Sequence, residues 1–514
     1  MESLDLEKRL LLINPWQTYE KELESEYQSY IPYGLACIGA IGIEQGYKTK
    51  IVDCLEEETR IEIENYVRFG KTSEELEAII SEFRPNIVGI SSTFSMFERD
   101  ATSVAELVKT IDTTIVVVLG GVTATLSEVY EPLLYEKTAY DIMARGEGEA
   151  TFRDLLKHYN PVTRKIENLN TIAGIAYRDK GSVVCTPDRE LVLNLDTLPF
   201  PALNLLNMRK TLHNKYFSRW RNNPANKKSI PIFTSRGCPY NCCFCSVHSQ
   251  VGFRYRTYSI EYVINLMKLC IEKFGIDHFH FEDDNLTFDV NRAKQLFREI
   301  AKLNITWDTP NGIRADRIDE EMIRLMKDSG MVSVSIAAES GSDKVRKNII
   351  HKNLSTDSIL NAIKLFDKND LPCIVFFVLG FPGETINDIQ ETVAFAKRIA
   401  VQYNTINMIF IANPLPGTEL SKMAHEKKYF VKKMTNSDYF VAIRANQGSI
   451  LETEQFTKKK IFGLLKDELD VPGYSVHNIA QPMFWADTEV AWHRAKRVFP
   501  KTSNRKVIWE WKED

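Results

Sequence analysis

Apolar runs alternate with amphipathic segments along the first 160 residues of the chain. Residues 31–46 and 73–83 have the period of helices, whereas five other runs are short and apolar, as buried strands are. These five runs are residues 9–15, 50–53, 87–92, 115–119 and 140–144. Apolar strands separated by amphipathic helices predict a parallel sheet covered on both faces. We therefore expect a doubly wound α/β domain whose ligand site lies beyond the carboxyl ends of the strands.

The same alternation resumes at Ile230 and continues to about residue 411. The predicted strands are residues 230–235, 278–282, 305–308, 332–338, 373–379 and 406–411. The helix after the first of them places on one face Val263, Leu266, Met267, Cys270 and Phe274. Six strand–helix units predict a partial (β/α)6 barrel with its chemistry at the strand ends.

The remaining segments interrupt this alternation. Residues 161–228 form a connector, in which Lys180-Gly181 separates two apolar runs and predicts a β-hairpin. Its polar, basic end at residues 219–228 is either a solvated linker or a loop near the active site. The last part of the chain is rich in aromatic residues and is expected to be helical. We expect four regions: residues 1–160, 161–228, 229–428 and 429–514.

The composition excludes several classes of protein. At 514 residues the chain is long enough for two or three domains, and its 44% apolar residues suffice for real cores. A net charge of −4 gives no reason to expect nucleic acid as a partner. No apolar run approaches the roughly 20 residues of a membrane-spanning helix, and no signal peptide opens the sequence. We therefore expect a cytoplasmic protein.

Three of the nine cysteines carry the strongest chemical signal. Cys238, Cys242 and Cys245 lie on one short stretch, and three thiolates can hold three irons of a cubane iron–sulfur cluster. The fourth iron then stays open, as in a catalytic metal site. A structural zinc site would need four ligands, yet no second Cys-x-x-Cys occurs. A disulfide framework fits poorly because the cysteine count is odd and the chain is long.

The spacing Cys-x-x-x-Cys-x-Phe-Cys, from Cys238 to Cys245, resembles the signature of radical S-adenosylmethionine (SAM) enzymes. The resemblance covers about residues 9–425. It implies that the open iron chelates SAM, and that the reduced cluster cleaves SAM to a 5′-deoxyadenosyl radical. An external electron donor of the flavodoxin or ferredoxin type would then be a partner. Cys243 would be a bystander in the core, and Phe244 would pack near the adenine.

The resemblance also implies SAM-binding roles for residues at other strand ends of the barrel. Asp283 or Asp284 is the candidate for the SAM amino group, and Arg314 for its carboxylate. Glu339 and Ser340 would contact the ribose and methionine ends, while the backbone of Gly380 and Phe381 would pack beside the adenine. From the residues alone, some of these positions are equally readable as helix caps.

The amino-terminal domain has small and polar residues where its strands end. They are Asn14, Ser92, Thr93, Gly120, Gly121, Thr123, Gly146 and Glu147. Such residues let a large, polar-edged ligand approach the backbone, although glycines also serve simply to turn a strand into a helix. Together they resemble the cobalamin-binding domain that precedes the barrel in one subclass of radical SAM enzymes. No Asp-x-His-x-x-Gly motif is present, so we expect no His ligand below the cobalt.

With both cofactors, the resemblance implies methylation of an unreactive carbon of a small-molecule or natural-product substrate. One SAM would methylate cob(I)alamin, and a second would yield the radical that activates the substrate. The two strand-end faces would then have to confront each other across the substrate. A second reading keeps the cofactors but predicts cyclisation, ring contraction or another rearrangement. A third is a cluster-bearing electron-transfer or binding protein. The sequence does not name a catalytic acid or base.

Overall fold

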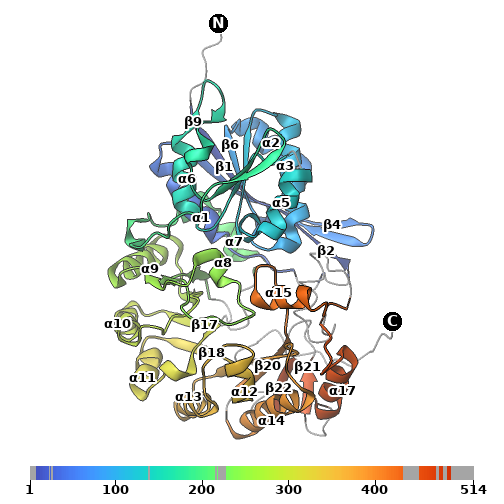
Figure 1. Ribbon diagram of the computed structural model, residues 1–514. Helices are drawn as coiled ribbons and strands as arrows, with labels where there is room; N and C mark the ends of the chain where they lie inside the picture. Colours follow the sequence, from blue (N-terminus) through green and yellow to red (C-terminus); the bar gives the residue numbers. More distant parts are fainter. Residues whose placement is uncertain are drawn as a thin grey trace. The chain divides into compact units, whose positions relative to one another are not determined.

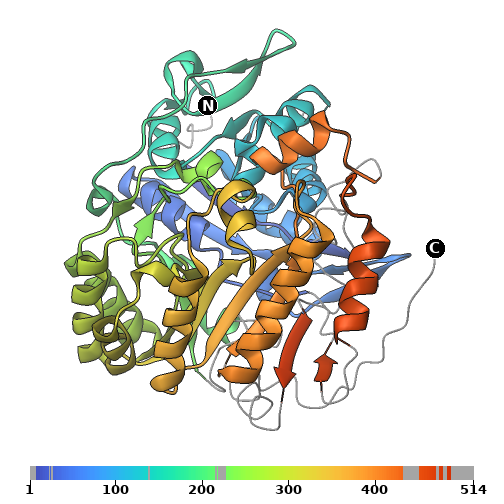
Figure 2. The ribbon, with the colours of Figure 1, turned by 60° about the horizontal axis from the view of Figure 1, so that its bottom comes forward.

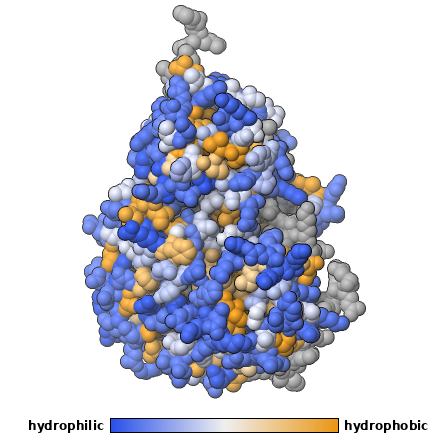
Figure 3. Space-filling model, viewed as in Figure 1, coloured by the Kyte–Doolittle hydropathy of each residue, from blue (hydrophilic) through white to orange (hydrophobic). Residues whose placement is uncertain are grey.

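The computed structural model describes residues 7–21, 24, 27–136, 139–214, 217, 227–403, 405–431, 451–469, 474–477 and 483–487. The chain divides into two compact units. The first comprises Met1–Ser218 and Val247–Gly252, and the second comprises Arg219–Ser246 and Phe253–Asp514. Within the described residues, no helix combines the length and apolar character that crossing a bilayer requires. The drawn face of the surface is mostly hydrophilic, with hydrophobic residues scattered over it (Figure 3).

A seven-stranded sheet forms the centre of the first unit, in the order β12-β11-β8-β7-β6-β1-β3. Its five parallel strands are β1 (Arg9–Asn14), β3 (Lys48–Asp53), β6 (Ile87–Ser91), β7 (Val116–Gly120) and β8 (Ile142–Ala144). They coincide with the five predicted apolar runs, so the predicted doubly wound domain is confirmed. Because β1 lies between β3 and β6, the strand order reverses there, and a crevice forms beyond the strand ends at such a point.

Helices cover both faces of this sheet (Figure 1). α1 (Tyr33–Glu44) and α6 (Gly148–Lys157) pack together on one face. The other face carries α2 (Ser73–Phe83), α3 (Glu98–Ile111) and α5 (Ser127–Glu136). Helix α2 begins with a capping box, in which Thr72 and Glu75 satisfy each other's backbone N–H groups. Its buried Leu76 and Ile80 join the apolar strand residues in one core.

The predicted hairpin is present and extends this first sheet. β11 (Ile175–Asp179) pairs antiparallel with both β8 and β12 (Ser182–Cys185). Its turn residues Lys180 and Gly181 have φ values of 47° and 84°, as this kind of tight turn requires. The hairpin therefore belongs to the first unit, although the sequence assigned it to a connector. A small sheet of β2 (Gln17–Glu20), β4 (Arg60–Ile63) and β5 (Tyr66–Phe69) was not expected.

The second unit is built on an eight-stranded sheet in the order β13-β16-β17-β18-β19-β20-β22-β21. The six parallel strands are β13 (Ser229–Ile232), β16 (His278–Phe281), β17 (Thr306–Ile313), β18 (Met331–Glu339), β19 (Cys373–Leu379) and β20 (Thr405–Ile411). They confirm the predicted partial barrel.

The carboxy-terminal region is only partly the helical region that the sequence predicts. α17 (Lys458–Leu469) is helical as expected. However, β22 (Met483–Asp487) pairs antiparallel with β20, and β21 (Tyr474–His477) pairs with β22. The tail thus closes the edge of the second sheet that β20 would otherwise leave unpaired. The basic stretch at 219–226 and the aromatic residues beyond 487 lie outside the described residues.

Helices line the outer face of the second sheet (Figure 2). They are α9 (Ile260–Phe274), α10 (Val290–Ile300), α11 (Glu320–Asp328), α13 (Thr356–Lys368) and α14 (Ile386–Gln402). Trp307 on β17 stacks on Phe297 of α10, and Phe377 on β19 meets Phe395 of α14. Because side chains alternate along a strand, Asp308 points to the opposite, inner face. There Ile374, Ile406 and Met408 form an apolar cluster.

One short helix departs from the order of the chain. α8 (Val247–Val251) follows Cys245 after a single residue, yet it belongs to the first unit. There it packs with α4 (Val122–Thr125), the turn of helix that follows β7. The chain on either side of α8 belongs to the second unit.

Candidate functional site

The structure separates the predicted cysteine ligands from their neighbour. Cys238, Cys242 and Cys245 are half-buried, whereas Cys243 is 3% exposed. Cys243 packs in an apolar cluster with Val345, and burial raises the pKa of its thiol to about 12. Cys243 is therefore a core residue. Burial also raises the pKa of Cys242, which disfavours its thiolate unless a positive centre lies against the sulfur.

Backbone contacts hold the cysteine loop at several points. Gly237 has a φ of 85°, and its N–H donates to Asp284 Oδ2 at 3.0 Å. Asn285 directs its side-chain amide at Cys238 Sγ, 3.8 Å away. The backbone N–H of Cys243 donates to Ile350 O, while its carbonyl accepts from Leu420 N. The loop is thus fixed by the residues after β16, by the segment after β18 and by α15 (Glu419–Glu426).

The two aspartates after β16 have different environments. Asp283 is buried and accepts hydrogen bonds from Thr234 N, Thr234 Oγ1 and Ser235 Oγ. Its carboxylate therefore joins the end of β16 to the end of β13. Asp284 has an exposed side chain whose hydrogen bond to Gly237 leaves it other acceptor capacity. Although the residue reaches solvent, the protein packed around its carboxyl group desolvates it in part and raises its pKa to about 6. Of the two predicted candidates, Asp284 is the one open to a ligand.

Glu339 ends β18 in a strained conformation. Its φ is 64°, in the left-handed region that non-glycine residues seldom adopt. The side chain is buried and pairs with Lys352 Nζ at 2.9 Å. An ion pair so well buried needs further polar partners to balance the loss of hydration. A polar ligand at this strand end would supply them.

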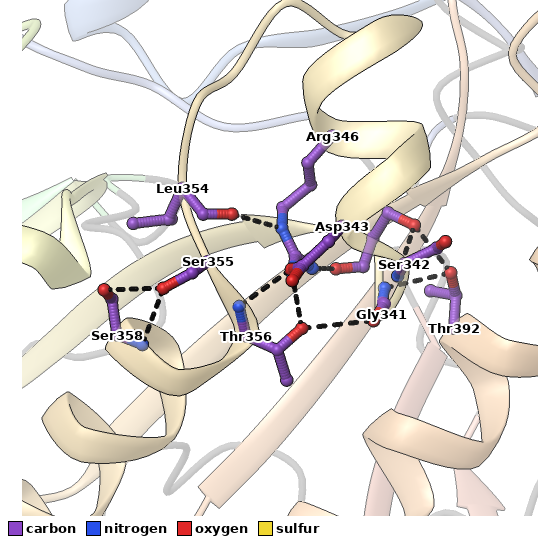
Figure 4. Close-up of polar contacts among 10 residues, drawn as sticks. Gly341, Ser342, Asp343, Arg346, Leu354, Ser355, Thr356, Ser358 and Thr392 are labelled. Atoms are coloured by element: carbon purple, nitrogen blue, oxygen red, sulfur yellow. Dashed lines mark hydrogen bonds and ion pairs between the residues drawn. The ribbon is translucent and has the colours of Figure 1, made fainter.

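The next residues form a closed polar network (Figure 4). Ser340 Oγ lies 2.8 Å from Thr392 Oγ1, which also accepts from Gly341 N. Arg346, fully buried, donates to the carbonyls of Ser340 and Leu354 and pairs with Asp343. The Ser340 hydroxyl is therefore engaged in hydrogen bonds inside the protein.

Arg314 is held next to the cysteine loop by two contacts. Its guanidinium forms two 3.0 Å hydrogen bonds with Asp316 and lies 3.8 Å from the ring centroid of Tyr240. Tyr240 lies between Cys238 and Cys242 in the sequence. A ligand carboxylate at Arg314, as the sequence predicts, would have to share the guanidinium with Asp316.

The turn after β19 is organised by a residue that sequence reasoning missed. The backbone N–H groups of Gly380 and Phe381 both donate to Glu384 Oε2, at 2.7 and 3.0 Å. Glu384 is fully buried, and desolvation raises its pKa to about 8. The turn brings the Phe381 ring within 5.7 Å of the Phe244 ring. A lone charged residue directly after a Gly-Phe-Pro-Gly turn was the signal for Glu384.

The strand ends of the first unit form a second candidate site. Asn14 Nδ2 donates to Asp53 Oδ1 at 2.8 Å, and Ser92 Oγ lies 2.7 Å from Thr123 Oγ1. Gly121 has a φ of 93°, and a Cβ atom there would lie 2.6 Å from Ser92 O. These contacts join the ends of β1, β3, β6 and β7, which are neighbours in the sheet.

A small cavity opens where the strand order reverses. It is lined by Asn14, Pro15, Trp16, Gln17, Tyr30, Ser91, Ser92, Thr93, Phe94 and Phe97. Asp53 lies behind Asn14, and burial raises its pKa to about 7. Sequence reasoning noted the strand that ends in Asp53 but did not propose the residue for the site. A carboxylate that ends an apolar strand was the signal.

Glycines keep the neighbouring part of this edge open. A Cβ atom on Gly120 would meet only Ile90 O at 4.0 Å, and one on Gly146 only Gln250 O at 3.9 Å. The Gly146 N–H donates to Thr125 Oγ1, so the loop that carries Glu147 is fixed to α4. The edge therefore presents backbone rather than side chains at these positions.

Comparison with known proteins finds a family model for a part of each unit. The model of the Radical SAM superfamily matches residues 232–396, and that of the B12 binding domain matches residues 24–156. An uncharacterized methyltransferase of Pyrococcus horikoshii is 30% identical over 444 residues, which are 85% of this chain and 86% of that protein. The cytidylyl-2-hydroxyethylphosphonate methyltransferase of Streptomyces wedmorensis is 29% identical over 447 residues, which are 80% of this chain and 81% of that protein.

Among solved structures, the fold is similar to that of the radical SAM methyltransferase TsrM from Kitasatospora setae with cobalamin and a [4Fe-4S] cluster bound. The TM-score is 0.62 at 17% sequence identity, and the match covers 97% of this chain and 89% of the other. At this level of identity the likeness concerns the fold.

Proposed function

Since the chain belongs to the family of cobalamin-dependent radical SAM methyltransferases, we propose that it methylates an unactivated carbon of a small-molecule or natural-product substrate. Its cofactors are a [4Fe-4S] cluster, SAM and cobalamin, as the sequence predicts. When bound, the cluster with SAM supplies a hydrogen-abstracting radical, and cobalamin supplies the methyl group. One chain that carries both a three-thiol loop and an open doubly wound edge is the observation behind this proposal.

Cys238, Cys242 and Cys245 are the proposed cluster ligands. Three half-buried thiols on one short loop suit three irons, and the buried Cys243 is withdrawn from them. The amide of Asn285 points to the sulfur of Cys238, and a donor at a ligand sulfur tunes a cluster. The loop therefore supplies ligands and a second-sphere contact but no fourth thiolate among the described residues.

For SAM, the residues around this loop divide into ligands and supports. Asp284 offers acceptor oxygens for an ammonium group, and the Lys352-paired Glu339 offers them for hydroxyls. The half-buried ring of Phe244 offers an aromatic surface for a purine, and the fully buried ring of Phe381 supports it. Asp283 and Ser340 are internally bonded, so we assign them the support of the loops.

For cobalamin, the open edge of the first unit is the proposed seat. Gly120 and Gly146 let a flat ligand approach the backbone, Gly121 makes the turn that packs against Ser92, and the paired hydroxyls of Ser92 and Thr123 hold this loop.

The test is an anaerobic assay of the full chain. Protein reconstituted with iron, sulfide and cobalamin is incubated with SAM and either dithionite or reduced flavodoxin, and the products are quantified. Cytidylyl-2-hydroxyethylphosphonate is a suitable first compound, because the relative from Streptomyces wedmorensis is named for it. Methyl transfer requires S-adenosylhomocysteine and 5′-deoxyadenosine in comparable amounts, together with a substrate that gains one methyl group.

Other outcomes would redirect the assignment. 5′-Deoxyadenosine alone, with a rearranged product, would favour cyclisation or ring contraction. Neither product from fully reconstituted, reduced protein would contradict a radical mechanism and leave an electron-transfer or binding role.

A further inference from the structure

A group of metal-ligating side chains lies in the second unit, apart from the cysteine loop. His278 and His280 on β16 and Asp308 on β17 are each at most 1% exposed. Each offers one ligand atom, and the three atoms lie within 4.8 Å of one another. Two histidines and a carboxylate form a common ligand set for divalent transition metals.

The strand pattern brings these residues together. His278 and His280 alternate with Phe279, so both face the same side of the sheet. In the register of the parallel strands, His280 is opposite Asp308 and His278 is opposite Thr306. Since Trp307 stacks against α10, Asp308 faces inward, on the side where the two imidazoles lie. The inner face of the sheet thus carries a polar group near the start of β16.

The hydrogen bonds of His278 leave an electrostatic problem. Thr306 Oγ1 donates to Asp277 O at 3.3 Å, so it accepts the hydrogen bond from His278 Nδ1, 2.8 Å away. With its proton on Nδ1, a neutral His278 directs the lone pair of Nε2 at Asp308 Oδ2. Two lone pairs facing each other in a dry interior repel, so a cation must lie between them: a proton or a metal ion.

The distance favours the metal ion. His280 Nδ1 lies 2.8 Å from Asp308 Oδ1, the length of a charge-assisted N–H···O bond, whereas His278 Nε2 and Asp308 Oδ2 are 3.5 Å apart. Two ligands that are each about 2.1 Å from one tetrahedral metal lie about 3.4 Å apart. The hydrogen bond from His278 to Thr306 is also the kind of outer contact that orients a metal-bound imidazole.

Hydroxyl groups on the next strand support the same reading. Ser333 is the register partner of Asp308 on β18, and Ser335 follows on the same face. Both hydroxyls are buried without a hydrogen-bond partner. A buried hydroxyl without a partner is costly, whereas a water molecule in the fourth position of a metal could bond to it.

We propose that His278, His280 and Asp308 bind one zinc-type divalent metal ion, which ties β16 to β17. The ion is separate from the cluster, and the proposal does not depend on the proposed methyl transfer. β16 ends just before Asp283 and Asp284, which contact the start of the cysteine loop. The ion would therefore stabilise the strand that positions this loop.

The test measures zinc in a full-length chain that cannot bind it at the cysteines. The background variant is Cys238→Ser/Cys242→Ser/Cys245→Ser, since three thiolates are themselves good zinc ligands. Zinc per chain is measured by elemental mass spectrometry after incubation with Zn²⁺ and gel filtration, and the visible spectrum is recorded after loading with Co²⁺. We expect about one zinc per chain and the spectrum of a Co²⁺ ion with nitrogen and oxygen ligands.

In the same background, Asp308→Asn and His280→Ala should each lower the zinc affinity by about tenfold or more. The matched control is His213→Ala, which removes an exposed histidine at the end of α7 (Met208–His213) and should keep the metal. Asp308→Asn preserves the side-chain shape, and circular dichroism checks that each variant is folded. The proposal would be overturned if the folded background protein bound no zinc, or if folded Asp308→Asn retained the zinc. His278, His280 and Asp308 would then be a hydrogen-bonded group that binds no metal.

Discussion

At the scale of single residues, the structure distinguishes side chains that adjoin each other in sequence. Cys242 and Cys243 are neighbours, but one is a half-buried thiol of the loop and the other is a core residue. Asp283 and Asp284 differ in the same way: the buried Asp283 is hydrogen-bonded inside the protein, whereas Asp284 has an exposed carboxylate. Adjacent residues point in different directions, so a motif must be read one position at a time.

The cysteine pair gives a direct test of this distinction. Cys242→Ala should lower the iron content from about four atoms per chain to a small residue and abolish 5′-deoxyadenosine formation. Cys243→Ala removes only a buried sulfur, so it should retain the iron and lower the free energy of unfolding by about 1–2 kcal/mol. Iron analysis and denaturant melts measure both. Loss of iron in Cys243→Ala alone would contradict the assignment of ligands.

Glu384 gives a prediction for pH. Burial raises its pKa from the usual 4.5 to about 8, so folding favours the protonated side chain. Its contribution to stability is therefore complete below about pH 4.5 and is lost as the pH rises through 8. Glu384→Gln keeps an acceptor for the N–H groups of Gly380 and Phe381 but cannot ionise. Between pH 5 and 9 the melting temperature of the variant should fall less than that of the wild type; parallel curves would contradict the raised pKa.

At the scale of helices and strands, the apolar pattern predicted all eleven parallel strands, because most of their residues are buried. It missed β21 and β22. These strands form by pairing at the edge of the second sheet, beside β20, and that edge exists only once the rest of the sheet has formed. It likewise missed β2, β4 and β5, whose residues are largely polar or half-exposed. Short edge strands take their conformation from tertiary pairing, which a local pattern does not record.

The candidate site was predictable to the same extent. The cysteine spacing and the polar residues at strand ends are local, and the sequence displays them. The pairing of Glu339 with Lys352, or of His280 with Asp308, joins segments that the sequence separates, so only the fold brings them together.

Substitutions at two turn glycines distinguish the cost of backbone strain from the cost of a steric clash. Gly121→Ala introduces a Cβ atom 2.6 Å from Ser92 O at a φ of 93°. We expect it to lower the free energy of unfolding by at least about 2 kcal/mol and to weaken cobalamin retention. Gly181→Ala has a similar φ of 84° but no atom within 4 Å, so it should cost about 1 kcal/mol. Equal losses in thermal melts would mean that the contact with Ser92 is unimportant.

At the scale of the whole molecule, each unit has its own ligand, and ligand binding stabilises what it binds. Cobalamin at about 100 times its dissociation constant should stabilise the first unit by about 2.7 kcal/mol. Gly120→Leu is the blocking variant, because a Cβ atom there would meet only Ile90 O at 4.0 Å and the longer side chain would occupy the proposed seat. Without cobalamin, this variant should have the melting temperature of the wild type. When cobalamin is added, its melting temperature should rise much less than that of the wild type. If calorimetry shows that cobalamin stabilises the variant as much as the wild type, the cofactor binds elsewhere.

The position of α8 has a consequence for how such a protein arises and changes. Because residues 247–252 belong to the first unit, the backbone passes between the two units three times. No single crossover in a gene can exchange one complete half for that of a relative. We expect chimeras joined once near residue 218 to give little soluble protein, and those that also transplant the six-residue segment to give more. A good yield of soluble protein from the single-junction chimeras would show that the two units can be exchanged independently. A poor yield would mean that the units have to be inherited together.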